Sequence, residues 1–258
     1  MKENQRVLFK LENSIAVLTL NRPDKANAFD GLMWLALEEA VKEIERDDSI
    51  RSVILTGAGK SFCGGLDINQ ALAEGIDLGD RTLRCGYESL HYLSGVFSRC
   101  ANLPVPVIAS IKGGCIGLGL ELALVCDIRL ASDSAIFSIP EVTFGLVPDC
   151  GGTQRLPRLV GPAMGKELIF TGRRISSTEA LRIGLVNHVY PLEELDRETY
   201  DMAAETAAQP LDALQASKRC IDRGMDAPLE AGLHFETSSS ESVLGEKAKT
   251  IIKHDRQT

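Results

Sequence analysis

Apolar and polar positions along the first two thirds of the chain predict strands that alternate with helices. Ser14–Leu20 and Ser52–Thr56 are β-branched, strand-like runs, and Gly31–Glu45 between them has apolar residues at helical spacing. Val107–Ile111 predicts a buried strand that leads through a glycine-rich segment into an apolar helix over Leu118–Cys126. Because helices repeatedly follow strands, the pattern predicts an α/β fold.

Helical periodicity predominates in the last third of the chain and in one long segment before it. That earlier segment, Asp80–Ala101, predicts an amphipathic helix that ends before Pro104. From Pro162 onward the pattern is helical, apart from a short predicted strand at Leu185–Tyr190. The composition changes near residue 200, so we assign residues 1–200 to a core and 201–258 to a helical region of the same domain.

Composition restricts the classes of partner. The chain has 258 residues, of which 44% are hydrophobic, and this is enough to bury the core of one large domain. Its 28 basic and 36 acidic residues give a net charge of −8, which argues against nucleic acid as a partner. Charged residues interrupt every long apolar run and the N-terminus lacks an apolar signal core, so we predict no membrane partner and a cytoplasmic location.

The cysteines indicate reduced thiols. There are seven of them, an odd number, with no CxxC pair and no clustering with the four histidines. This distribution fits a cytosol-like compartment and predicts neither a disulfide framework nor a metal site.

Three acidic residues lie in the apolar, glycine-rich stretch between Gly113 and Gly152. They are Glu121, Glu141 and Asp149. A carboxylate among aliphatic residues loses hydration, so its pKa rises toward the range useful for proton transfer unless a partner stabilises the charge. The three acids are therefore candidate catalytic groups.

Two groups of glycines predict a close approach of backbone to a ligand. Gly117 comes directly before the predicted helix Leu118–Cys126, and Gly119 lies in its first turn. That turn would present free N–H groups. The pair Gly64 and Gly65 forms a second such turn. Two turns of this kind can build an oxyanion hole, although glycines also serve simply to permit tight turns and helix packing.

Four segments carry a resemblance to a known family. They read LNRPDKANAF (Leu20–Phe29), SFCGGLDI (Ser61–Ile68), IKGGCIGLGLELALVCDIRLAS (Ile111–Ser132) and PEVTFGLVPDCGGTQRLPRLVG (Pro140–Gly161). In order and spacing they resemble the enoyl-CoA hydratase/isomerase family, or crotonase superfamily. The resemblance implies a crotonase (ClpP-like) spiral of ββα units with a helical C-terminal trimerisation region. It also implies an acyl-CoA thioester substrate and homotrimers that often pair into hexamers.

The resemblance also assigns site residues. The backbone N–H groups of Leu66 and Leu118 correspond to the oxyanion hole, and the Gly64 carbonyl corresponds to the contact with the adenine of coenzyme A. The positions that correspond to substrate and coenzyme A contacts are Lys25, Gly64, Leu66, Asp67 and Ile68. Because coenzyme A is part of the substrate, no separate cofactor is predicted.

Glu121 and Glu141 match the two catalytic glutamates of the hydratases, 20 positions apart. Together they would hold a water and add it to a trans-2-enoyl-CoA, giving a 3-hydroxyacyl-CoA. Without the resemblance, Glu121 is equally explained as a carboxylate at a helix N-terminus, and Glu141 as a first-turn residue after Pro140.

Asp149 departs from the hydratase pattern, in which a small residue is usual. Dienoyl-CoA isomerases and ring-opening isomerases carry an aspartate here, so an alternative function is double-bond isomerisation by Glu141 and Asp149. A turn or helix-capping aspartate before Cys150 is an equally good interpretation. Nearby, Arg155 is expected to be an ion-pair or capping residue.

The C-terminal sequence SVLGEKAKTIIKHDRQT also departs from the family, because it lacks the usual Ala-Phe and Lys-Arg-Pro pattern. It leaves the residues that close over the acyl chain unassigned. A function of a different class, a non-catalytic crotonase-fold scaffold, is disfavoured because a scaffold has no need of three desolvated acids.

Overall fold

The computed structural model describes residues 5–78, 82–83 and 87–255. The chain divides into two compact units, Met1–Ala204 and Glu205–Thr258, which we describe separately. None of the helices in the described ranges is long and apolar enough to cross a membrane.

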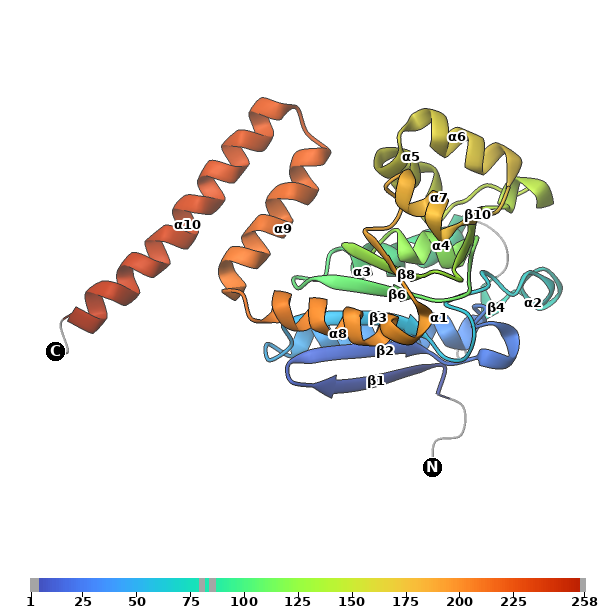
Figure 1. The fold of residues 1–258 in the computed structure, drawn as a ribbon, viewed down its shortest axis with the longest axis horizontal. Helices are drawn as coiled ribbons and strands as arrows, with labels where there is room; N and C mark the ends of the chain where they lie inside the picture. The colour runs from blue at the N-terminus through green and yellow to red at the C-terminus, as the bar shows by residue number, and fades with distance from the viewer. Residues whose placement is uncertain (1–4, 79–81, 84–86, 256–258) are drawn as a thin grey trace. The chain divides into compact units, whose positions relative to one another are not determined.

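A six-stranded sheet forms the centre of the first unit (Figure 1). β1 pairs with β2 in antiparallel fashion, and the other neighbouring strands are parallel. In spatial order the strands are β1 (Val7–Glu12), β2 (Ile15–Leu20), β3 (Ser52–Gly57), β6 (Val107–Ile111), β8 (Ile128–Ser132) and β11 (His188–Tyr190). The strands predicted at Ser14–Leu20, Ser52–Thr56 and Val107–Ile111 are confirmed.

A second sheet of three strands lies beside the predicted catalytic segments. β7 (Gly114–Ile116) runs parallel to β9 (Ile136–Ser138), and β10 (Ile175–Ser176) pairs with β9 in antiparallel fashion. β7 leads into helix α4 (Leu118–Ala123), and β9 leads into the 3₁₀-helix η2 (Glu141–Phe144). Since the ends of parallel strands meet at one edge of a sheet, this pairing brings α4 and η2 to the same place.

Helices cover the sheets of the first unit, and α5, α6 and α7 gather on one side (Figure 1). The helices not yet named are η1 (Pro23–Lys25), α1 (Gly31–Arg46), α2 (Ile68–Glu74), α3 (Tyr87–Ala101), α5 (Gly152–Val160), α6 (Pro162–Thr171), α7 (Ser177–Arg182) and α8 (Leu192–Ala207). α8 runs across the boundary between the two units.

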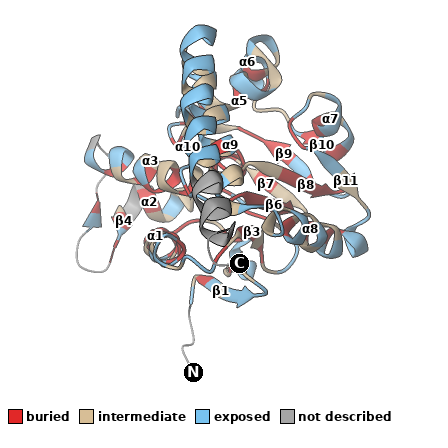
Figure 2. Ribbon diagram, turned by 90° about the vertical axis from the view of Figure 1, so that its left-hand side faces the viewer, coloured by how far each residue is buried: buried red, intermediate tan, exposed pale blue. Residues whose placement is uncertain are grey.

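Buried residues concentrate in the strands and on the inner faces of these helices (Figure 2). Asp30 caps the N-terminus of α1, and its side chain accepts a hydrogen bond from Met33 N. Further along α1, Trp34 contacts Phe29 and Phe97, with ring centroids 4.7 and 5.0 Å away, and all three are fully buried. This aromatic cluster anchors α1 and α3 to the segment that precedes the site.

Three element boundaries differ from the sequence prediction. The helix predicted from Asp80 begins at Tyr87, because Thr82–Leu83 form strand β5 against β4 (Ile76–Asp77); residues 79–81 and 84–86 lie outside the described ranges. α4 ends at Ala123 rather than Cys126, because Val125 N and Cys126 N donate to carbonyls three residues earlier, in tighter turns. The predicted strand Leu185–Tyr190 is confined to β11.

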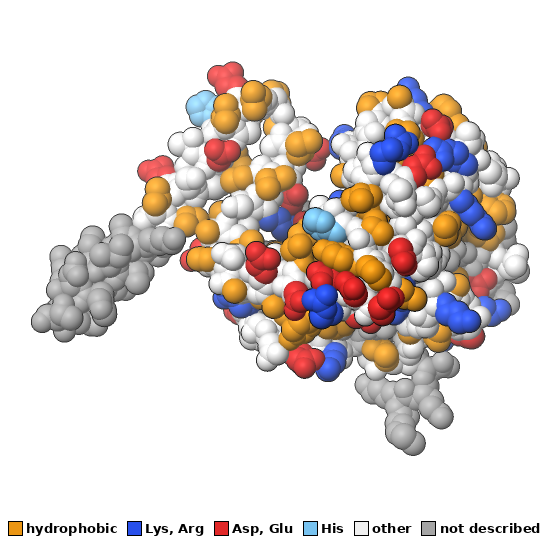
Figure 3. Space-filling view, in the orientation of Figure 1, with side chains coloured by type: hydrophobic (Ala, Val, Ile, Leu, Met, Phe, Trp, Pro, Cys, Tyr) orange, Lys and Arg blue, Asp and Glu red, His pale blue; other side chains and the backbone are white. Residues whose placement is uncertain are grey.

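The second unit contains a hairpin of α9 (Leu211–Met225) and α10 (Leu229–Asp255). Near its turn, a Cβ on Gly232 would lie 3.5 Å from the Gly224 Cα, and the Arg223 guanidinium lies 4.9 Å from the centre of the Phe235 ring. Hydrophobic side chains are visible along the hairpin in Figure 3. The large apolar residues exposed here are Ile221, Met225, Leu229, Leu233 and Leu244.

Candidate active site

The loop that carries Leu66 is held against the turn after β2 by backbone hydrogen bonds. Gly64 N donates to Ala26 O at 2.7 Å, and Phe29 N donates to Gly65 O at 2.8 Å. Asp67 N donates back to Phe29 O at 2.9 Å. These alternating bonds fix the conformation of residues 64–67.

Asn27 connects the same two segments from inside. Its side chain is fully buried, and Nδ2 lies within hydrogen-bond distance of Ala58 O, Ser61 O and Phe62 O at 2.9, 2.8 and 3.2 Å. Its Oδ1 accepts a hydrogen bond from Arg22 N at 2.9 Å. Sequence reasoning did not single out Asn27, because only the folded structure brings these carbonyls around it.

The N–H groups of Leu66 and Leu118 are both left without an acceptor among the residues that the structure describes. Their turns lie against each other: a Cβ on Gly65 would lie 2.9 Å from Ile116 O and 3.7 Å from Leu118 N. Gly117, with φ 54° and ψ −123°, aims its own N–H away, at Ser138 O. The structure therefore brings the two predicted oxyanion-hole residues together.

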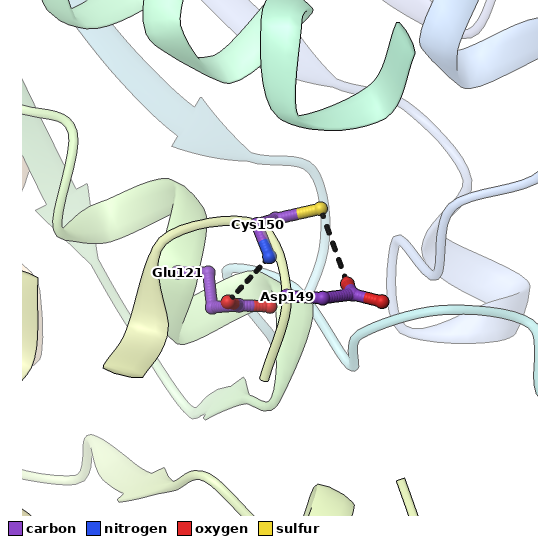
Figure 4. Close-up of side chains that lie close together, drawn as sticks. All are labelled: Glu121, Asp149 and Cys150. Atoms are coloured by element: carbon purple, nitrogen blue, oxygen red, sulfur yellow. Dashed lines mark hydrogen bonds between the residues drawn. The ribbon is translucent and has the colours of Figure 1, made fainter. Parts of the chain in front are cut away.

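Glu121 lies on α4 and is only 2% exposed. Its Oε1 accepts hydrogen bonds from Cys150 N at 2.9 Å and from Gly152 N at 2.7 Å; the first bond is drawn in Figure 4. Burial raises the pKa of Glu121 to about 8, and the charges of Glu141 and Asp149 act in the same direction, whereas the two N–H bonds oppose the rise. A carboxyl group in this state can exchange a proton near neutral pH.

Glu141 begins η2 and faces the glycine turn before α4. A Cβ on Gly117 would lie 2.6 Å from Glu141 Oε1, and Glu141 Oε2 is buried without a hydrogen-bond partner in the described part of the chain. Burial raises the pKa of Glu141 to about 6, and the Asp149 charge adds to the rise. Between pH 6 and 8 the Glu121 and Glu141 pair therefore holds about one proton, which gives the site one acid and one base.

Asp149 precedes α5 and is exposed. Its Oδ1 accepts a hydrogen bond from the Cys150 thiol at 3.6 Å, and partial burial raises its pKa (Figure 4). One ligand atom from each of Glu121, Asp149 and Cys150 lies within 4.8 Å of the others. Burial and the neighbouring carboxylates raise the pKa of the Cys150 thiol, so this group favours the protonated state over a metal-binding thiolate.

The remaining residues predicted to contact the substrate lie on the loop that carries Leu66 and on the turn beside it. Lys25 ends η1 and is exposed, and Gly64 is exposed beside it. The Asp67 carboxylate pairs with Arg22 at 2.9 Å and accepts a hydrogen bond from Gln70 N at the start of α2. Its side chain is therefore committed to holding the loop, and Ile68 N is bonded to Leu66 O.

Arg155 differs from its sequence prediction. It forms no ion pair with an acidic residue in the described ranges; instead its Nη1 donates to Cys150 O at 3.1 Å. The partner is a backbone carbonyl of the turn that binds Glu121, and nothing in the local sequence signals this contact.

A family model for enoyl-CoA hydratase/isomerase matches residues 10–253. The chain belongs to this family. The match confirms the resemblance carried by the four sequence segments. Short-chain-enoyl-CoA hydratase of Clostridium acetobutylicum is 40% identical over 257 residues, which cover 99% of this chain and 94% of that protein.

Solved structures of the family share the fold. An enoyl-CoA hydratase from Bacillus anthracis has a TM-score of 0.87 and 32% identity, with coverage of 98% of this chain and 97% of that one. A Thermobifida fusca protein in complex with acetoacetyl-CoA has a TM-score of 0.85 and 30% identity, with coverage of 94% and 96%. The protein therefore has the crotonase fold that the sequence predicted.

Proposed function

We propose that the protein is an enoyl-CoA hydratase, a lyase that converts a trans-2-enoyl-CoA into a 3-hydroxyacyl-CoA. The observation that carries this proposal is that two N–H groups without an acceptor in the described part of the chain, on Leu66 and Leu118, lie near the buried Glu121 and the half-buried Glu141 on adjoining elements. The name of the Clostridium relative and the acetoacetyl-CoA bound by the Thermobifida neighbour support it.

In the proposed reaction the thioester carbonyl oxygen accepts hydrogen bonds from Leu66 N and Leu118 N. The water oxygen forms a bond to the β carbon, and the π electrons move to the carbonyl oxygen, giving an enolate. Donors already in place favour this charge by several kcal/mol, on the order of 3. One carboxyl of the Glu121 and Glu141 pair takes the water proton, and the other gives a proton to the α carbon, so the pair ends with the proton count at which it began.

Asp149 supports a second candidate, double-bond isomerisation of an enoyl- or dienoyl-CoA. Its carboxylate accepts hydrogen bonds from the Cys150 thiol and from its own backbone N–H, and it forms no ion pair within the described ranges. In this reaction a carboxylate removes a proton at one carbon, and Glu141 or Asp149 returns a proton at another, without addition of water.

The experiment that separates these candidates follows the ultraviolet absorbance of a conjugated thioester. Loss of the crotonyl-CoA signal in the presence of the protein is expected and supports hydration. Loss of a 2,4-dienoyl-CoA signal, with crotonyl-CoA untouched, would replace hydration by isomerisation. If neither signal changes and coenzyme A thioesters also fail to bind, the protein is not an acyl-CoA enzyme.

Further features of the proposal concern assembly and binding. The exposed apolar residues of the α9–α10 hairpin support homotrimers, or dimers of trimers, in which this surface is covered. Lys25 and the carbonyl of Gly64 are proposed to contact coenzyme A, and the reaction requires no cofactor beyond the substrate. We also propose that the protein is cytoplasmic and acts in fatty-acid β-oxidation. Sedimentation analysis of the full chain tests the assembly.

A further inference from the structure

Arg155 is a partly buried cation whose guanidinium binds a backbone carbonyl and forms no ion pair with a carboxylate in the described ranges. It lies in the second turn of α5, and burial lowers its pKa. Arg22, another partly buried arginine of this unit, pairs with the carboxylates of Asp30 and Asp67. Arg155 has no such partner among the described residues, so a different interaction must keep its guanidinium inside.

The guanidinium holds the loop that binds Glu121. Arg155 Nη1 donates to Cys150 O, and Arg155 N donates to Gly151 O at 2.7 Å, so one residue binds two successive carbonyls. The N–H groups of Cys150 and Gly152, in the same three residues, bind Glu121 Oε1. Arg155 therefore fixes one side of the turn while Glu121 occupies the other.

This arrangement requires glycine at position 151. Gly151 has φ 108°, and a Cβ there would lie 1.9 Å from Arg155 Nη1. The guanidinium thus lies directly against the backbone of the turn.

The charge of Arg155 also acts on Glu121. The groups that favour the charged form of Arg155 are Glu121 on α4, Cys150 in the loop and Cys100 on α3. The same attraction favours the carboxylate form of Glu121. The burial of Glu121 and the repulsion from Glu141 and Asp149 favour its neutral form, and the N–H groups of Gly152 and Cys150, which belong to the turn that Arg155 binds, oppose them.

We propose that Arg155 is a positioning residue for Glu121: its guanidinium orients the Cys150–Gly152 turn, whose N–H groups bind the Glu121 carboxyl group, and places a positive charge at that turn. The role of Glu121 in turnover rests on the proposed acyl-CoA chemistry, whereas the structural and electrostatic coupling to Arg155 does not.

The test compares Arg155→Met, which removes the charge at similar volume, with Arg155→Lys, which keeps it. Arg158→Met is the matched control, because Arg158 is exposed on the same helix and its Nη1 binds Gln154. We expect R155M to lower kcat for hydration by about 10- to 100-fold, with KM changed by less than about 3-fold. R155K should restore most of kcat, and R158M should match the unaltered protein.

A second readout does not depend on turnover. Carbon-13 NMR of labelled glutamate carboxyls, with Glu121→Gln for assignment, follows the titration of Glu121. We expect its midpoint to move to higher pH in R155M and to return in R155K, because a nearby cation stabilises the carboxylate. If R155M does not fold, Arg155→Gln, which keeps a donor but no charge, carries the same test.

Two results would overturn the proposal. One is an unchanged Glu121 midpoint in a folded, uncharged Arg155 variant. The other is a fall in kcat that Arg155→Lys does not reverse. An unaltered protein that hydrates no enoyl-CoA would instead refute the proposed function, while the NMR titration still decides the role of Arg155.

Discussion

The half of the site that carries the Leu66 and Leu118 N–H groups is built from backbone, whereas the half that carries the acids is built from side chains. In the backbone half, hydrogen bonds to residues 26–29 and the buried Asn27 amide leave little freedom. In the acid half, Glu121 is anchored by two N–H groups, Glu141 Oε2 has no partner among described residues, and Asp149 is exposed.

This difference indicates that the two halves have separate roles, stabilisation of negative charge and proton transfer. A rigid pair of N–H donors can stabilise an enolate whatever reaction forms it, because the negative charge always develops on the same oxygen. The acids differ in burial and therefore in pKa, and in the proposed reaction they determine where protons are taken and returned. The backbone half is suited to a class of substrate, and the acid half to one reaction.

The largest effect is expected when one of the two glutamate carboxyl groups of the acid half is replaced by an amide. Glu121→Gln or Glu141→Gln is expected to lower kcat for crotonyl-CoA hydration by about 1,000-fold while binding of the thioester changes little, because each acts on proton transfer. Steady-state kinetics and calorimetric binding measure the two quantities. Glu43→Gln, on the exposed face of α1, is the control. Near-full hydration by either variant would remove that glutamate from the mechanism.

The backbone half is tested by Gly117→Ala. The new Cβ would lie 2.6 Å from Glu141 Oε1, at a φ and ψ that only glycine adopts easily, so the first turn of α4 must shift. We expect kcat to fall about 100-fold. Gly95→Ala in α3 is the matched control, since no atom lies within 4 Å of its added Cβ. Equal activity of both variants would show that the Leu118 N–H is not an oxyanion donor.

Asp149→Asn separates the two candidate reactions. If Asp149 serves only isomerisation, hydration of crotonyl-CoA should change by less than about 10-fold, whereas any 2,4-dienoyl-CoA isomerisation should fall by about 100-fold or more. The two absorbance assays measure this on the same preparation. A large loss of hydration would instead place Asp149 beside Glu121 and Glu141 in the hydratase mechanism.

The smallest expected effect concerns stability. The pKa of Glu121 rises from 4.5 to about 8 on folding, so the folded protein keeps a proton that the unfolded chain releases. The stability associated with this group is therefore present below pH 4.5 and is lost as the pH rises toward 8. Glu121→Gln removes this dependence, and at pH 8 it should raise the free energy of unfolding by about 1 kcal/mol or more. Urea denaturation at pH 5 and pH 8 measures it, and a gain that is equal at both pH values would contradict the cause.

The sequence allowed much of the site to be predicted, because local patterns carry its parts. The glycines before α4 and the pair Gly64 and Gly65 indicated turns with free N–H groups, and the four family segments assigned Leu66 and Leu118. The structure brings these turns together. All three acids were found by their apolar neighbours along the chain, which correctly indicated the burial of Glu121 and the partial burial of Glu141, whereas Asp149 is exposed.

Contacts between distant segments were not predictable in the same way. Asn27 binds carbonyls 31 to 35 positions away, and the Cys150 and Gly152 N–H groups reach Glu121 across about 30 residues. Arg155 was expected to form an ion pair or a cap, and only the fold revealed that its partner is the Cys150 carbonyl. Every residue has the same backbone carbonyl, and every residue except proline has the same N–H, so the sequence does not show which of these groups a side chain will bind.

By itself, the sequence determined the family, the α/β class, the three acids and the two glycine turns, because each is encoded in residues close together along the chain. Only the tertiary structure decided how the acids differ. The parallel pairing of β7 with β9 brings Glu121 and Glu141 to one place, and the two N–H groups of the Cys150–Gly152 turn, which Arg155 holds, bind Glu121. Burial and hydrogen bonding at that point, which no local pattern specifies, set the pKa values on which the chemistry depends.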